Sequence, residues 1–238
     1  MEVNNWLNSI QSLLYPSGCL LCGAAGDYKL QFCPACYRSL PFNRHTCPIC
    51  ALPLPPGVSP DMLCGRCIKK QPPYAQSFAP LRYEPPVSKL ISGLKFHRRL
   101  YLVEPLARVL TDRMGETFTR PDLIIPVPLH PLRLQERGFN QSLELSRAVA
   151  RHYHLPVNWQ LCQRVRHTQA QSDLSEKARQ KNLRQAFEVC GDVQGAHLVL
   201  FDDVITTGAT VTELSKTLKK AGAKRVDVWA MARTPGYR

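Results

Sequence analysis

From residue 77 onward, short apolar runs alternate with longer segments in which apolar residues recur three and four positions apart. The first pattern is typical of buried strands, and the second is typical of helices that bury one face. Strands are predicted over 77–83, 122–127, 197–201 and 226–231, and helices over 86–96, 101–117, 142–152, 175–187 and 211–221. Strands that are apolar almost throughout and are separated by helices indicate an α/β domain built on a parallel sheet.

The first third of the chain does not follow this alternation. Apolar residues at helical spacing predict one short amphipathic helix over 3–15. Thirteen of the 20 prolines fall within the first 86 residues. Proline fixes φ and removes an amide donor, so these stretches are predicted to be loops and linkers. The sequence therefore predicts an N-terminal module over 1–75 and the α/β domain over 76–238.

Eight of the ten cysteines form four Cys-x-x-Cys pairs in the N-terminal module: Cys19 and Cys22, Cys33 and Cys36, Cys47 and Cys50, and Cys64 and Cys67. Two such pairs supply the four thiolates of a tetrahedral zinc site, so two structural zinc ions are predicted. The alternative is a disulfide scaffold or redox chemistry, but disulfides need an oxidising compartment, and no export signal is recognised. Sequential ribbons, each built from two consecutive pairs, are favoured over an interleaved cross-brace. The isolated Cys162 and Cys190 are predicted to be small buried hydrophobic residues.

The chain carries 31 Lys and Arg against 18 Asp and Glu, a net charge of +13. This excess favours polyanionic partners, which are nucleic acid, phosphorylated small molecules or an anionic membrane surface. Residues 133–184 hold ten basic and four acidic side chains, so part of the excess is concentrated there. No apolar run reaches the length of a transmembrane helix, and the N-terminus lacks the basic region of a signal peptide. We therefore expect a cytoplasmic protein without stable membrane insertion.

The most specific feature is the segment 198–210, where an apolar run ends in two adjacent carboxylates, Asp202 and Asp203. A short loop with three threonines and one glycine follows and opens directly into the predicted helix 211–221. The N–H groups and positive dipole end of a helix bind phosphate, and the loop adds hydroxyl donors. Carboxylates repel phosphate, so the acid pair is expected to accept hydrogen bonds from sugar hydroxyls or to lie near Mg²⁺. These features together predict a ribose 5-phosphate site.

This segment closely resembles the 5-phosphoribosyl-1-diphosphate (PRPP) signature of type I phosphoribosyltransferases. The resemblance implies that Asp202 and Asp203 hold the ribose hydroxyls of PRPP, which binds together with Mg²⁺, and that the following loop cradles the 5-phosphate. The loop residues are Thr206, Thr207, Gly208, Ala209 and Thr210. In that fold a second loop, after the first core strand, binds the diphosphate. The matching residues here are Pro128, Leu129 and His130.

Further motifs narrow the resemblance to one family. Arg-Gly-Phe-Asn-Gln over 137–141, Leu-Lys-Phe over 94–96, the basic stretch 164–187 and the cysteine pairs together resemble the competence protein F (ComF) family. Members are phosphoribosyltransferase-like cytoplasmic proteins needed for natural transformation, in which imported single-stranded DNA is taken up and processed. The resemblance implies a type I phosphoribosyltransferase-like parallel sheet with helices on both faces, preceded by a small double zinc-ribbon module.

The resemblance and the charge together predict a ComF-type protein that handles single-stranded DNA, retains a PRPP site and works with DNA-uptake or recombination proteins. The expected DNA contacts are the basic residues Arg133, Arg137, Arg164 and Arg166, with Phe139, Tyr153, Trp159 or His167 as stacking groups. Two alternatives stay open. One is an active phosphoribosyltransferase of nucleobase or related metabolism, and the other is a zinc-ribbon interaction module whose phosphoribosyl site is vestigial. The sequence shows no hood for an acceptor base, so no catalytic residue is assigned.

Overall fold

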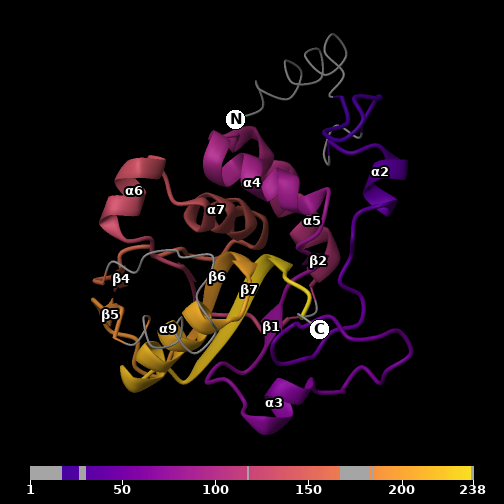
Figure 1. Cartoon of the computed structure of the whole chain (residues 1–238). Helices are drawn as coiled ribbons and strands as arrows, with labels where there is room; N and C mark the ends of the chain where they lie inside the picture. Colours follow the sequence, from indigo (N-terminus) through magenta and orange to yellow (C-terminus); the bar gives the residue numbers. More distant parts are fainter. Residues whose placement is uncertain (1–17, 27–30, 117, 167–182, 184, 237–238) are drawn as a thin grey trace.

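The computed structural model describes residues 18–26, 31–116, 118–166, 183 and 185–236 (Figure 1). The helix predicted over 3–15 and most of the helix predicted over 175–187 lie outside the described residues. Within the described part, strands and helices alternate from residue 77 onward, as predicted. No described helix is long and apolar enough to cross a membrane.

Five described strands form the central sheet, and every pairing in that sheet is parallel. They are β1 (Ser77–Phe78), β2 (Leu81–Arg82), β3 (Leu123–Pro126), β6 (His197–Ile205) and β7 (Arg225–Arg233). Their order is β1-β7-β6-β3, with β2 also paired to β7. The predicted parallel sheet is therefore confirmed. β6 and β7 are buried along nearly their whole length, which explains why their sequences are apolar without alternation.

Two strands differ in extent from the prediction. The strand predicted over 77–83 is divided into β1 and β2, and Pro80 lies in the gap, where its missing N–H cannot join a ladder. The strand predicted over 197–201 continues to Ile205, because its pairing with β7 continues as far as Arg233. The acid pair therefore lies inside β6 and is held by the sheet itself.

Helices cover both faces of the sheet, as predicted (Figure 1). The main helices are α4 (Val87–His97), α5 (Val103–Met114), α7 (Gln141–Tyr153) and α9 (Ala209–Lys220). A short 3-10 helix, η1 (Leu100–Leu102), leads into α5. Successive residues of β6 enter two separate apolar cores. Val199 and Phe201 join the core formed with α4, α5 and α7, whereas Leu198 and Leu200 join the core formed with α9. The sheet is thus the middle layer of three.

Three short elements of the described α/β part lie outside the predicted pattern: α6 (Pro131–Arg137), β4 (Cys162–Arg164) and β5 (Phe187–Val189). α6 begins with a proline, which is tolerated in the first helical turn, and ends at Gly138, whose φ of 82° few other residues adopt. β4 and β5 pair antiparallel and form a small separate sheet. The prediction that Phe187 ends a helix is therefore wrong, because the residue pairs with β4.

The two isolated cysteines have different surroundings. Cys162 is buried in β4, as predicted, whereas Cys190 is exposed, so the prediction for Cys190 is wrong. Side chains alternate between the two faces of a strand. Phe187 points into the core, so Glu188 and Cys190 fall on the outward side.

The N-terminal part packs against the rest of the chain through apolar and backbone contacts. Phe32 and Leu40 flank α2 (Pro34–Arg38) and are buried in the same core as residues of α4 and α5. The Asn43 N–H donates to the Pro80 carbonyl at 2.8 Å. α3 (Gly65–Lys69) is the second short helix of this part. The boundary between 1–75 and 76–238 stays a prediction, because the two sides share a core.

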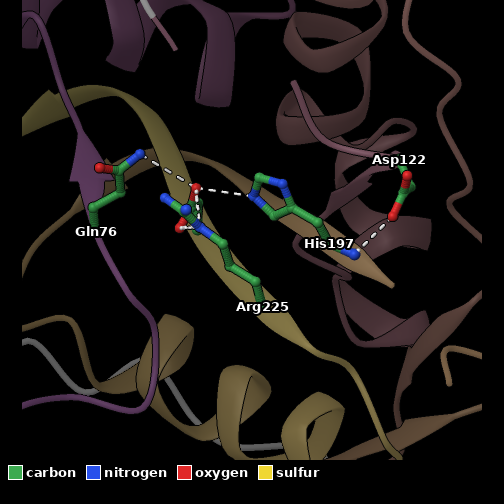
Figure 2. A network of polar contacts seen from close by, with 5 residues as sticks. Gln76, Asp122, His197 and Arg225 are labelled. Atoms are coloured by element: carbon green, nitrogen blue, oxygen red, sulfur yellow. Dashed lines mark hydrogen bonds and ion pairs between the residues drawn. The ribbon is translucent and has the colours of Figure 1, made fainter. Parts of the chain in front are cut away.

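A polar network fastens the sheet at the N-terminal ends of its strands (Figure 2). The Asp227 side chain is 2% exposed and accepts hydrogen bonds from Arg225 Nε at 3.0 and 3.1 Å. It also lies 3.0 Å from His197 Nε2 and accepts from Gln76 Nε2 at 3.3 Å. The His197 N–H donates to the Asp122 carboxylate at 2.8 Å. One buried carboxylate therefore joins the beginnings of β6 and β7 to the segment that precedes β1.

Asp227→Ala is expected to lower the free energy of unfolding by about 3 kcal/mol, because it removes the shared acceptor of two basic side chains at a buried site. Urea unfolding measures this change. The exposed Asp61→Ala is the control and should change stability by less than about 0.5 kcal/mol. Equal losses in the two variants would show that the network does not hold the sheet.

Candidate functional site

The candidate site begins with the acid pair near the carboxyl end of β6. β6 lies between β3 and β7, and ligands of open parallel sheets bind outside the carboxyl ends of the strands. The Asp203 side chain is 4% exposed, and Asp202 is half-buried. Two adjacent carboxylates in this position need compensating partners.

Lys95, on α4, neutralises one of the two acids. Its Nζ lies 2.5 Å from Asp203 Oδ2. Burial by itself lowers the pKa of Lys95, but the nearby acidic groups, chiefly Asp203 and then Asp202, together hold that pKa above its ordinary value. Sequence reasoning missed this contact. The available signal was a lysine directly after the buried Leu94 and one helical turn beyond the buried Ile91.

The second acid, Asp202, is held by hydrogen bonds. Its Oδ1 accepts hydrogen bonds from Ser142 Oγ at 3.2 Å and from the Asp203 N–H at 2.9 Å. Burial, followed by the neighbouring Asp203 carboxylate, raises the pKa of Asp202 to about 7, although Lys95 acts in the opposite direction. Asp202 therefore changes charge near neutral pH. Ser142, at the start of α7, is a second site residue that sequence reasoning missed.

The threonine loop, residues 206–210, follows β6 and leads into α9. Gly208 caps the helix with a φ of 78°. Any other residue at this position would be strained, because this backbone conformation is left-handed. The Thr207 hydroxyl accepts from the Ala209 N–H at 3.3 Å, and the Thr212 N–H donates to the Gly208 carbonyl at 2.9 Å. The loop thus places hydroxyl groups beside the N-terminal end of a 12-residue helix, where an anion is favoured.

The second predicted loop lies on the neighbouring strand. β3 pairs with β6, and the Val127 N–H that follows β3 donates to the Phe201 carbonyl at 2.8 Å. Pro128, Leu129 and His130 therefore begin at the same edge of the sheet as the acid pair. His130 caps α6, and its Nδ1 accepts from the Leu132 N–H at 3.3 Å.

Arginines add positive charge around the acid pair. The Arg137 guanidinium lies over the Phe96 ring at 5.6 Å, and the Arg164 guanidinium lies over the Phe187 ring at 5.8 Å. Burial lowers the pKa of both arginines; Asp203 partly opposes this for Arg137, and Asp202 partly opposes it for Arg164. The structure thus brings these two arginines into the electrostatic field of the acids. Arg133 is half-buried and its charge acts on both, whereas Arg166 is exposed beyond β4.

The cysteine pairs come together in two clusters. One contains Cys19, Cys22, Cys33 and Cys36, and the other contains Cys47, Cys50, Cys64 and Cys67. All ten cysteines are free thiols, and the ligand atoms of each cluster lie within 4.8 Å of one another. The sequential pairing is confirmed, and the interleaved arrangement is wrong.

Both clusters fit a structural zinc ion. Four sulfurs about 2.3 Å from a central zinc lie about 3.8 Å from one another in a tetrahedron. The Sγ atoms of Cys22 and Cys33 are 3.8 Å apart, and those of Cys50 and Cys64 are 3.5 Å apart. Burial and the neighbouring thiols raise the pKa of Cys50 to about 11, so a cation is needed to hold four thiolates together.

Comparison with known proteins identifies the zinc part first. Residues 10–68 match the double zinc ribbon domain family. The chain is 39% identical over 230 residues to DNA utilization protein YhgH of Shigella flexneri, and the match covers 93% of this chain and 99% of that relative. It is 36% identical over 178 residues to competence protein F of Haemophilus influenzae, and that match covers 71% of this chain and 78% of the relative.

These findings define the chain as a double zinc-ribbon protein with a parallel α/β domain. It belongs to the ComF/YhgH family of DNA utilization and competence proteins, so the resemblance seen in the sequence is confirmed. The structure also overlaps the purine phosphoribosyltransferase of Pyrococcus horikoshii, at 18% identity, with a TM-score of 0.35, over 56% of this chain and 82% of that one. The parallel pairing and the strand order define the α/β fold.

Asp202→Asn is expected to stabilise the folded protein near pH 8. The pKa of this carboxyl is about 7 in the folded protein and about 4 in the unfolded chain. The folded protein therefore loses stability progressively as the pH rises from about 4 to about 7. At pH values above that range, removing the charge should raise the melting temperature by about 4 °C. The gain should shrink as the pH is lowered towards about 4. A gain that does not depend on pH, or a loss at every pH, would contradict the raised pKa.

Proposed function

We propose that this protein binds PRPP or a related phosphoribosyl compound together with Mg²⁺, and that it handles single-stranded DNA in DNA utilization or natural transformation. One observation carries the proposal: the structure gathers the acid pair, the threonine loop and two arginines at one edge of the sheet. Vicinal acids suit the hydroxyls of ribose, and a hydroxyl-rich helix entrance suits its 5-phosphate. The arginines and the 128–130 loop suit a diphosphate.

Because Lys95 pairs with Asp203, we expect the two acids to have different roles. Asp203 already holds a cation, so Asp202 is the acid that is left to accept a ribose hydroxyl or to approach Mg²⁺. Arg164 is half-buried and lies in the electrostatic field of Asp202, so we assign it to the diphosphate rather than to a DNA backbone. Arg137 stands between the two roles, because it lies in the field of Asp203 and also stacks on Phe96. Arg133 does so too, because its charge acts on both Arg137 and Arg164.

The DNA part of the proposal draws on the relatives, whose names refer to DNA utilization and competence. A surface with suitable chemistry lies where the end of α4 meets the end of α6 (Figure 1). Phe96 is 69% exposed and stacks with Arg137, and Arg98 Nη2 donates to the Glu136 carbonyl at 3.5 Å. We call Phe96, Arg98, Arg133 and Arg137 the basic aromatic face. Exposed rings stack on bases, and arginines hold phosphates.

The predicted stacking groups fit this role less well. Tyr153 is buried, and its hydroxyl donates to the carbonyls of Thr111 and Gly115, so its assignment as a stacking group is wrong. Phe139 packs partly against the core, whereas Trp159 is exposed. His167 lies outside the described residues. The sequence pointed to aromatic residues in the basic region, but the face depends on Phe96 from a helix outside that region.

One observation favours the alternative of an active phosphoribosyltransferase. A carboxyl with a pKa of about 7 is able to exchange protons at neutral pH, and Asp202 is such a group. Release of diphosphate from PRPP in the presence of a nucleobase would support this alternative.

We place the protein in the cytoplasm with DNA-uptake or recombination proteins as partners.

The PRPP site is tested by calorimetry on Asp202→Asn, a variant expected to be folded and more stable than the wild type. Its affinity for PRPP with Mg²⁺ should fall at least about tenfold, because an amide carries no charge for the metal. Wild-type affinity should also weaken as the pH drops below about 7, because Asp202 then binds a proton, whereas the variant should not respond. Asp192→Asn, which neutralises an exposed acid, is the control. Unchanged affinity in Asp202→Asn would mean that the acid pair is not the site.

The DNA surface is tested by fluorescence anisotropy with a labelled deoxythymidine oligonucleotide. Arg98→Gln should make the slope of log affinity against log salt shallower by about 0.7, because one phosphate contact is lost. Phe96→Ala should weaken binding about tenfold and leave the slope unchanged, because stacking releases no counterions.

Arg147→Gln is the control for the DNA experiment. It removes the same charge from α7, where Arg147 pairs with Glu144 at 3.2 Å, and should leave both affinity and slope close to those of the wild type. If Phe96→Ala binds like the wild type, the basic aromatic face is not the DNA surface.

A further inference from the structure

A buried arginine joins the second zinc cluster to the threonine loop. Arg233, the last residue of β7, is 2% exposed. Its Nε donates to the Cys50 carbonyl at 3.1 Å. Its Nη1 donates to the Ile205 carbonyl at 2.9 Å and also to the Thr206 carbonyl. One guanidinium group therefore contacts a zinc-ligand residue and the entrance of the loop at the same time.

A second arginine makes the same connection from the zinc ribbon itself. Arg66 lies in α3 between Cys64 and Cys67, two ligands of the second cluster. Its Nη2 donates to the Thr207 carbonyl at 3.1 Å. Arg233 and Arg66 together hold three consecutive carbonyls, those of residues 205, 206 and 207.

Holding these carbonyls also orients the N–H groups of the loop. In a trans peptide the carbonyl and the N–H of the following residue point in opposite directions. Carbonyls 205–207 point towards the two arginines, so the N–H groups of residues 206–208 point away from them. Consecutive N–H groups on one side of a turn form a concave anion site.

The charge of the zinc cluster gives a reason for this arrangement. Arg233 donates hydrogen bonds to the carbonyl oxygens of Cys50, Ile205, Thr206 and Thr234, and it also lies beside the Cys50 thiol. A buried guanidinium without a nearby negative charge is costly. A zinc ion held by four thiolates carries a net negative charge, and Cys50 places that charge beside Arg233.

The first cluster lies elsewhere. Tyr37, in α2, donates its hydroxyl hydrogen bond to the Asp112 carboxylate on α5. Arg113, also on α5, lies over the Phe42 ring at 4.9 Å. The part of the chain around the first cluster is therefore fastened to α5, whereas the second cluster is fastened to the loop. The molecule itself thus offers a matched comparison between two zinc sites.

We propose that Arg233 and Arg66 are positioning residues that make the second zinc cluster a structural part of the phosphoribosyl site. Zinc at Cys47, Cys50, Cys64 and Cys67 orders the threonine loop for its ligand, and zinc at the first cluster does not. This inference rests on the proposed binding of PRPP at that loop. It adds a requirement for one particular zinc site.

The test compares Cys64→Ser with Cys19→Ser, because both side chains belong to residues that are 4% exposed. Each full-length variant should retain about one zinc by elemental analysis. In Cys64→Ser, hydrogen exchange of the amides in 205–210 should quicken without any ligand present, and PRPP affinity should fall at least about tenfold. In Cys19→Ser, both readouts should stay close to those of the wild type.

Arg66→Gln keeps the inference testable if Cys64→Ser does not fold. Arg66→Gln should retain both zinc ions and still quicken loop exchange, with PRPP affinity weakened about fivefold. Lys69→Gln removes a charge from the same helix and should change neither readout.

The proposed function and this inference can fail separately. If the wild type does not bind PRPP but loop exchange still depends on the second cluster, the positioning role stands and the ligand assignment is overturned. Wild-type loop exchange in both Cys64→Ser and Arg66→Gln would overturn the positioning role. Equal loss of loop order in Cys19→Ser and Cys64→Ser would overturn it as well.

Discussion

The structure depends on the cost of placing two adjacent carboxylates inside the central strand. Asp202 and Asp203 sit in β6, where apolar residues fill both faces of the sheet, and ionised groups are unfavourable there without partners. α4 supplies Lys95, and α7 supplies Ser142. Two helices of one layer thus serve the same pair of acids. Lys95 offsets the charge of Asp203, whereas burial leaves Asp202 with a pKa of about 7.

The chemistry that could be predicted from the sequence is local in the chain. Zinc ligands occur in pairs two residues apart, and the acid pair is separated from the threonine loop by two residues, so spacing alone reveals them. Lys95 and Arg233 are different, because they meet the site only after the chain has folded. Arg233 and Cys50 are 183 residues apart in the sequence. The motif over 94–96 marks Lys95 without indicating its partner, and Arg233 is marked only by a charge at the end of an apolar strand.

The same distinction applies to the fold. The apolar runs of β3, β6 and β7 predict a parallel sheet because both of its faces are buried. The β4–β5 pair could not be predicted in this way, because its strands are three residues long and only partly buried. For Phe187, pairing with β4 outweighs a sequence that reads as helical. Tertiary contacts decide the conformation where a local pattern is short.

The contact between Cys50 and Arg233 also has a consequence for the order in which the protein becomes complete. Chains leave the ribosome from the N-terminus, and a zinc ribbon is able to bind its metal once its own four ligands have been made. Its partner on β7 is made 183 residues later. The second zinc ribbon is therefore expected to bind its metal before β7 has been made, and to dock on Arg233 only afterwards. We therefore expect the threonine loop to become ordered late in folding, because contacts between residues so far apart in the sequence form slowly.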